Sequence, residues 1–166
     1  MLSGGKIRVT MTLLAIPALL SMFLGTAEQT QAVFRDPVLE LTMPPGVPLP
    51  TATKAADASG ADYSAETNGG IYRIQHTDMP GDTEKLFASI LGAIKGNFRV
   101  DAQQRFTLQG HSGMRLMLSS PTLNQVQRME CFHVNNRLVR VWVIARTTAD
   151  LETPAVRAFF DSLRIK

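Results

Sequence analysis

Polar and apolar positions first form a clear pattern at residues 38–43, whose sequence VLELTM predicts a first strand. Prolines end this strand, since proline cannot donate a hydrogen bond to a sheet; they stand at positions 44, 45, 48 and 50. Residues 51–60 are rich in Ala, Thr, Ser and Asp, which predicts an exposed loop. Residues 62–67 and 71–77 predict a hairpin, because Asn68-Gly69-Gly70 between them tolerates the positive φ of a tight turn.

Two segments have apolar residues at helical spacing. The first follows Asp82, a good N-cap, and ends at Gly96-Asn97, where a left-handed residue is easily accommodated. The second follows the cap Thr153 and begins with Pro154, which suits the first helical position. Their apolar residues stand at positions 86, 87, 90, 91 and 94 of the first segment and 156, 159, 160 and 163 of the second.

Four successive strands are predicted between these helices, at residues 99–108, 114–118, 126–134 and 137–145. Asn135-Asn136 is a two-residue turn between the last two. Residues 138–144 are apolar on both faces apart from Arg140, whereas a strand with one solvated face would alternate. We therefore expect a central strand covered on both sides, and an α+β fold in which an antiparallel β-sheet is sandwiched between helices.

The N-terminus has the three parts of a secretory signal. Lys6 and Arg8 precede an apolar run at 9–24, and the small residues Gly25-Thr26-Ala27 follow it. The alternative is an uncleaved membrane anchor, but this run is shorter than the about 20 apolar residues needed for a span and contains polar residues and a proline. The prediction is a signal at 1–27 and a single domain at 28–166, exported to the periplasm or outside the cell. Ala32 ends a second candidate cleavage site.

Charge and cysteine content narrow the class of protein. The chain has 166 residues and a net charge of +3. Without Lys6 and Arg8, the 17 basic residues fall to 15 against 14 acidic ones, so the mature protein is near neutral and no basic stripe indicates nucleic-acid binding. Cys131 is the single cysteine and cannot form an intramolecular disulfide. No cysteine stands directly after the apolar run, at the position where the lipid of a lipoprotein is attached, which excludes that modification.

Cys131 and His133 share one face of a predicted strand, and the turn at 135–136 would place Arg140 opposite Cys131. A nucleophilic thiol needs such neighbours. However, side chains two apart on a strand point in parallel, about 7 Å apart. A structural, partly buried cysteine is therefore the favoured interpretation.

Other candidate sites are weaker. His76, His111, His133 and Asp78 are scattered, without the spacing of metal ligands. The segment 110–113 has the wrong spacing for a serine nucleophile elbow, which requires Gly-x-Ser-x-Gly between a strand and a helix. The glycine pair at 69–70 opens no helix and does not indicate a phosphate loop. We therefore predict no catalytic residue, metal or cofactor.

Four segments resemble PsbP-like domains: Gly110-His111-Ser112-Gly113, the strand and basic hairpin at 128–138, the final helix at 158–165, and the strand with its proline-glycine exit at 41–48. The resemblance implies an antiparallel sheet sandwiched between helices. The family includes an extrinsic photosystem II subunit, a Ran-binding nuclear import factor and many exported bacterial proteins of unknown role. The resemblance therefore also implies a non-catalytic accessory or binding protein. The chain is shorter than the plant photosystem subunit and has no recognisable metal cluster.

The sequence thus predicts an exported, non-enzymatic accessory or protein-interaction domain with a protein partner in the cell envelope. The alternative is a small-ligand-binding protein with a pocket between sheet and helix. A thiol or serine hydrolase has little support. Trp142, Arg140 and His133 are the candidate residues for the ligand or partner surface. An apolar patch near the proline-rich segment would favour a protein partner, and a pocket with several convergent polar groups would favour a small ligand.

Overall fold

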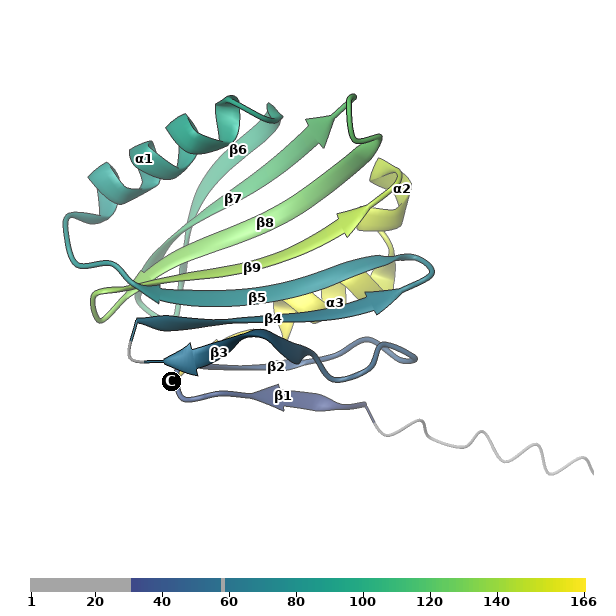
Figure 1. Cartoon of the computed structure of the whole chain (residues 1–166), viewed down its shortest axis with the longest axis horizontal. Coiled ribbons are helices and arrows are strands. Elements are labelled where there is room, and N and C mark those ends of the chain that lie inside the picture. Colours follow the sequence, from purple (N-terminus) through teal and green to yellow (C-terminus); the bar gives the residue numbers. More distant parts are fainter. Residues whose placement is uncertain (1–30, 58) are drawn as a thin grey trace, which may run out of the picture.

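The computed structural model describes residues 31–57 and 59–166, so the predicted signal at 1–27 lies outside the described residues. In the described part, a seven-stranded antiparallel sheet packs against a three-stranded sheet and three helices (Figure 1). None of these helices is long and apolar enough to cross a membrane.

The large sheet has the strand order β3-β4-β5-β9-β8-β7-β6, and every neighbouring pair is antiparallel. Its strands are β3 (Thr51–Asp57), β4 (Gly60–Thr67), β5 (Gly70–Asp78), β6 (Arg99–Leu108), β7 (His111–Ser120), β8 (Gln125–Val134) and β9 (Arg137–Ala145). The small sheet and the helices are β1 (Val33–Arg35), β2 (Leu39–Thr42), β10 (Arg164–Ile165), α1 (Thr83–Lys95), α2 (Thr148–Leu151) and α3 (Pro154–Asp161).

The predicted hairpins from β4 to β5 and from β8 to β9 are confirmed. Asn135 and Asn136 have φ angles of 48° and 62°, the left-handed values that a two-residue turn needs. This turn fixes the register so that Cys131 pairs with Arg140, as the sequence predicts. Because a shift of one residue would exchange the two faces of a strand, the turn decides which side chains share a face.

Both predicted helix starts are confirmed. Asp82 accepts a hydrogen bond from the Lys85 amide at 3.0 Å, and Thr153 accepts one from the Val156 amide at 3.3 Å. The apolar face of α1 buries Phe87 against one face of the large sheet. The core on this face, called the α1 face below, consists of Phe87, Ile90, Met114, Leu116, Leu118, Met129, Cys131, Leu138 and Trp142.

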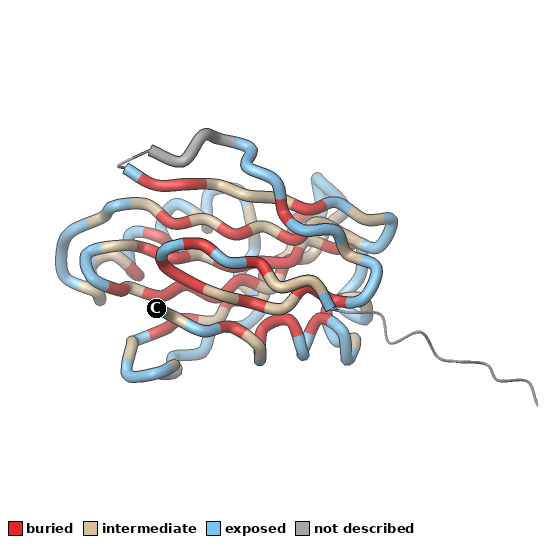
Figure 2. Tube along the Cα trace, turned by 90° about the horizontal axis from the view of Figure 1, so that it is seen from below, coloured by how far each residue is buried: buried red, intermediate tan, exposed pale blue. Residues whose placement is uncertain are grey.

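The opposite face of the large sheet forms a second core with the small sheet, α2 and α3. Strand β9 lies in the middle of the large sheet and contributes to both cores, which confirms the predicted central strand. Val139, Val141 and Val143 face α3, whereas Leu138 and Trp142 face α1. Figure 2 shows the resulting alternation of buried and less buried positions along the strands.

The predicted sheet sandwiched between helices is wrong. Strands make up 52% and helices 19% of the residues that the structure describes, so the fold is β-rich. Opposite α1, the large sheet is covered mainly by the small sheet and by two short helices, because residues 33–42 and the last residues of the chain pair with each other as β1, β2 and β10. These strands have two to four residues, too few for a clear alternation in the sequence.

The predicted loop at 51–60 is also wrong, since β3 and the start of β4 occupy it. Strand β3 is an edge strand with register shifts after Ala52 and Lys54. An edge strand needs fewer apolar residues than a central one, and irregular pairing interrupts the alternation. Its composition of Thr, Ala and Asp therefore resembles that of a loop.

Candidate functional site

The two halves of the α1 face of the large sheet differ in what lies over them. Helix α1 lies over the side formed by β6, β7 and β8, and Trp142 is at the margin of the core beneath it. Over β4 and β5, no described helix or strand lies on this face (Figure 1). The uncovered strands carry polar and charged side chains in place of a core.

Trp142 lies between two arginines at this margin. The guanidinium carbon of Arg73 is 4.9 Å from the centre of the indole ring, and that of Arg140 is 5.8 Å from it. Both distances are within the range of a cation–π interaction. Arg73 comes from β5 and pairs directly with Trp142, while Arg140 precedes it by two residues on β9. We call these three residues, with Asp62 and Gln75, the Arg–Trp surface.

A single carboxylate supports the two arginines of the Arg–Trp surface. Arg73 Nη2 donates to Asp62 Oδ2 at 2.6 Å, and Gln75 Nε2 lies 3.5 Å from the same oxygen. Arg140 Nη2 donates to Gln75 Oε1. Two guanidiniums against one carboxylate leave an excess of positive charge. The Nε atoms of Arg73 and Arg140 are buried with no hydrogen-bond partner, so donor groups remain unused.

Burial is the largest influence on Arg140. Burial lowers the pKa of its guanidinium from the ordinary value, because desolvation disfavours the charged form. Cys131 and Asp62 raise this pKa, and the positive charge of Arg73 lowers it. A carboxylate or another anion close to Arg140 would therefore balance a positive charge that is partly removed from solvent and has too little negative charge near it.

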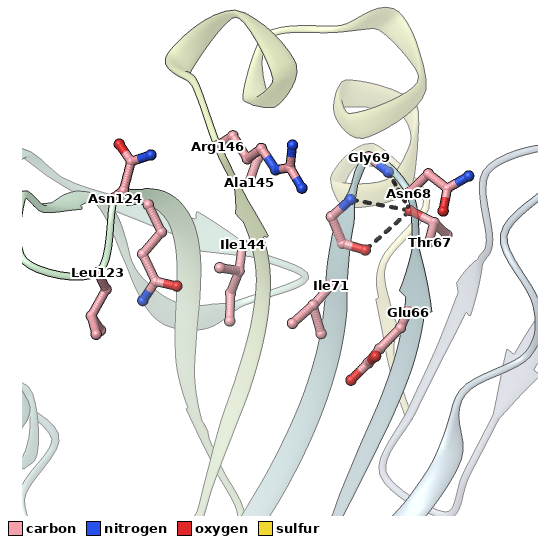
Figure 3. A pocket seen from close by; sticks show the side chains of 12 residues that line it. Glu66, Thr67, Asn68, Gly69, Ile71, Leu123, Asn124, Ile144, Ala145 and Arg146 are labelled. Carbon is pink, nitrogen blue, oxygen red and sulfur yellow. Dashed lines mark hydrogen bonds between the residues drawn. The ribbon is translucent and has the colours of Figure 1, made fainter.

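The Arg–Trp surface continues into a pocket lined by the ends of the strands β4, β5, β8 and β9, which we call the hairpin-end pocket (Figure 3). Ile71 and Ile144 pair with each other across β5 and β9. They lie on the same face as Arg73 and Trp142, two residues away on each strand. They form part of the wall of a cavity of about 350 Å³. Arg146 and Glu66 also line it, both exposed, and Leu123 at its edge is 59% exposed.

The hairpin-end pocket has a well-defined wall at the turn between β4 and β5. Thr67 Oγ1 accepts hydrogen bonds from the amides of Gly69 and Gly70 at 3.2 and 3.1 Å (Figure 3). A Cβ at Gly70 would lie 2.4 Å from the carbonyl oxygen of Ile144, so only glycine fits this approach of β5 to β9. The sequence prediction found the turn but not the pocket, because the pocket also needs the distant loop that carries Leu123.

His133 lies on the same face as Trp142 and Arg140, and the structure gives it a different environment. Its Nδ1 is 2.8 Å from Thr83 Oγ1, and its Nε2 is 3.2 Å from the carbonyl oxygen of Met79. Both ring nitrogens thus contact the segment that begins α1. The geometry assigns His133 to the attachment of α1 to β8, and the Arg–Trp surface does not include it.

Cys131 is completely buried, more so than the predicted partly buried site. Burial raises the pKa of its thiol to about 12; Arg140, which pairs with it, acts in the opposite direction, and Glu130 raises the pKa further. Desolvation therefore outweighs the nearby cation, and the thiolate is not favoured near neutral pH. This environment agrees with a structural cysteine.

The histidines proposed as alternative metal ligands lie in separate environments. His76 Nε2 is 3.0 Å from Asp36 Oδ2 in a buried pair that connects β5 to the segment before β2. His133 contacts the start of α1, as described above, and His111 begins β7. Among residues 31–57 and 59–166, no three His, Cys, Asp or Glu side chains are grouped as metal ligands would be.

Two further hollows lie on the α3 side of the molecule. A mainly apolar groove of about 370 Å³ lies between the proline-rich exit of β2 and α3. Its residues include Met43, Pro44, Pro45, Ala158 and Phe159. A second cavity of about 340 Å³ lies between the large sheet and the helices α2 and α3. We call it the arginine cavity, because it is lined by Arg115, Met117, Arg128, Leu151, Glu152 and Arg157.

The chain matches no protein-family model and no curated protein. Among solved structures, it is similar to PA94 from Pseudomonas aeruginosa, a protein of unknown function described as a candidate regulator. The two chains are 15% identical, the match covers 73% of this chain and 85% of the other, and the TM-score is 0.48. A likeness at this level carries no inference about function.

Proposed function

We propose that this protein is an exported, non-enzymatic accessory domain that binds another protein of the cell envelope. The observation that carries the proposal is the Arg–Trp surface on uncovered strands of the large sheet. Arginine is enriched among the residues that dominate protein interfaces, and the buried indole of Trp142 holds the two guanidiniums by cation–π contacts. Here an indole and two guanidiniums lie side by side, next to the apolar residues Ile71 and Ile144.

Charge indicates the kind of partner. The open half of the α1 face, meaning the Arg–Trp surface together with the hairpin-end pocket, has the cations Arg73, Arg140 and Arg146 and the anions Asp62 and Glu66. One positive charge is in excess. The complementary partner presents a carboxylate beside an apolar side chain, which would occupy the wall formed by the two isoleucines.

The apolar groove beside Pro44 and Pro45 also supports a protein partner. Its wall is mainly apolar and lies near the proline-rich segment, and exposed apolar surface of this kind is a feature of protein-interaction sites. It lies beside α3 rather than α1, so it is separate from the Arg–Trp surface.

Capture from envelope extract tests the proposal. The purified protein is immobilised in the wild-type form and as the double variant Arg73→Gln/Arg146→Gln. The matched control is Arg99→Gln/Arg105→Gln, which removes the same charge from the edge strand β6. We expect a protein captured by the wild type and the control to be lost from the first variant. Capture that is unchanged by the first variant, or reduced equally by both, contradicts the proposal.

A second candidate function is the binding of a small ligand between sheet and helix. The arginine cavity favours it, because its residues come from β7 and β8 on one side and from α2 and α3 on the other. Three arginines line a cavity of about 340 Å³, within the usual size range of small-ligand pockets. Saturable binding of a small molecule at this cavity is the measurement that tests it.

A further inference from the structure

The arginine cavity lies on the α3 side of the large sheet, opposite the Arg–Trp surface. Arg115 and Met117 come from β7, Arg128 from β8, and Arg157 from α3. Arg115 and Arg128 face the same side of the sheet as Glu130, because Arg115 pairs with Glu130 and Arg128 is two residues from it. A group of guanidiniums is thus gathered under the C-terminal helices.

Glu130 is the buried anion of this cluster, only 2% exposed. Arg115 Nε donates to its Oε1 at 2.7 Å, and Arg128 Nη2 donates to the same oxygen at 2.9 Å. Within the described residues, the two guanidiniums make no other hydrogen bond. The Nε of Arg128 is buried without a partner. Arg115 Nη1 and Nη2 and Arg128 Nη1 make no hydrogen bond within the described residues, so several donors of the pair remain for a ligand.

The arginines are held in place before any ligand arrives. The guanidinium carbon of Arg128 is 4.1 Å from the centre of the Phe160 ring, and that of Arg115 is 5.0 Å from the centre of the Phe106 ring. Arg157 donates through Nε and Nη2 to the carbonyl oxygen of Glu152, at 2.9 and 2.7 Å. Fixed donors bind an anion with less loss of side-chain entropy than free ones.

Charge and wall composition together define a ligand class. Three guanidiniums face two carboxylates, Glu130 and Glu152, which leaves one positive charge for a bound anion. Met117 and Leu151 supply apolar wall beside them. Guanidiniums and carboxylates match in shape and charge. We propose that the arginine cavity binds a small aliphatic monocarboxylate, its carboxylate against the arginines and its chain along Met117 and Leu151; this inference rests on the second candidate function.

Titration of the ¹⁵N-labelled protein with sodium hexanoate tests the inference, with hexanol and inorganic phosphate as comparison probes. We expect hexanoate to shift the amide signals of residues 115, 128 and 157 in a saturable way, with little effect of either comparison probe. Arg157→Gln removes an exposed arginine and should weaken hexanoate binding by about tenfold, the loss of one charge-assisted hydrogen bond. The matched control Arg99→Gln should bind as the wild type does.

Arg128→Lys provides a second variant, because it keeps the charge and loses the planar group that lies over Phe160. We expect weaker binding in a protein whose spectrum remains that of a folded chain. Hexanoate binding that both variants leave unchanged overturns the inference. Equal shifts from hexanol or phosphate leave a small-ligand site and overturn the carboxylate assignment. If none of the three probes shifts these amides, both the inference and the second candidate function fail.

Discussion

The two faces of the large sheet are completed in different ways. On the α3 side, the small sheet and two short helices cover a core that extends from Ala65 on β4 to Phe132 on β8. On the α1 side, one helix covers β6 to β8, and the strands beyond Trp142 carry arginine, aspartate and glutamine. The same seven strands thus support a closed core on one side and a half-open, charged surface on the other.

This difference shows how a sheet face can remain open without exposing a large apolar patch. Trp142 is 7% exposed, because it packs at the margin of the core beneath α1 and because Arg73 and Arg140 lie over its ring. Arginine covers an aromatic face while keeping its charge near solvent. The Arg73 side chain remains 35% exposed and is therefore accessible to a partner.

The largest effect is expected where the two cores meet, at Val141 on the central strand. Val141 is fully buried, and Val141→Asp would place an unpaired charge in a dry site. We expect a loss of several kcal/mol, a large part of a domain's usual stability of roughly 5–15 kcal/mol. Urea unfolding measures it. Gln104→Asp on the exposed edge strand is the control, and equal curves for both variants would contradict the central position of β9.

The pKa of the Cys131 thiol reports how far water is excluded from the part of the large sheet that α1 covers. Burial raises the pKa of its thiol from 9.0 to about 12, so between these values the unfolded chain has lost a proton that the folded protein retains. The contribution of this pKa difference to the free energy of unfolding is fully present below pH 9. It is lost as the pH rises toward 12, by about 1.4 kcal/mol per pH unit.

The measurement is urea unfolding between pH 8 and 10.5 for the wild type and Cys131→Ala. Burial also raises the pKa of Tyr63 and Tyr72, so the difference between the two proteins isolates the thiol. We expect the wild type to lose about 2 kcal/mol more than the variant at the upper end. An identical pH dependence, together with rapid alkylation of the folded protein, would show that Cys131 is accessible.

A smaller effect is expected at Arg73, one of the two arginines that lie over Trp142. Arg73→Gln removes the ion pair with Asp62 and one cation–π contact with Trp142. Since the Arg73 side chain is 35% exposed, we expect a loss of about 1 kcal/mol. A double-mutant cycle with Asp62→Asn measures the coupling of the pair. A loss as large as that of Val141→Asp would mean that this half is core rather than surface.

The smallest effect is expected at Arg146 in the hairpin-end pocket. Arg146 is exposed, and the structure gives it no ion pair or hydrogen bond with the described residues. Arg146→Gln should change the free energy of unfolding by less than about 0.5 kcal/mol. Thermal unfolding checks this value. A larger loss would show that Arg146 supports the fold, and would remove it from the proposed partner surface.

Strong local signals made much of the fold predictable. The Asn135-Asn136 turn fixes the register of β8 and β9, and the caps Asp82 and Thr153 fix two helix starts. The apolar run around Val141, interrupted only by Arg140, correctly predicts a central strand. By contrast, β3 and the small sheet depend on pairing with distant segments, and their own residues contain too little pattern to show it.

The site was predictable only in part, for the same reason. Trp142 and Arg140 stand out on the central strand, but Arg73 joins them through the pairing of β5 with β9, which are far apart in sequence. The arginine cavity has no sequence signature, because Arg115, Arg128 and Arg157 come from three elements and meet only through packing. His133 was selected by its strand position, whereas its ring contacts the start of α1.

Site-specific photo-crosslinking tests most directly whether the open half of the α1 face is the partner surface. Leu123 is 59% exposed and lines the hairpin-end pocket, whereas Gln104 is exposed on the edge strand β6 and lies outside this pocket. Each is replaced by benzoylphenylalanine in the producing cells. We expect a crosslink to another protein from position 123, lost when Arg73→Gln is added, and no such crosslink from position 104. Equal crosslinking at both positions, or crosslinking at 104 alone, would contradict the assignment of the open half as the partner surface.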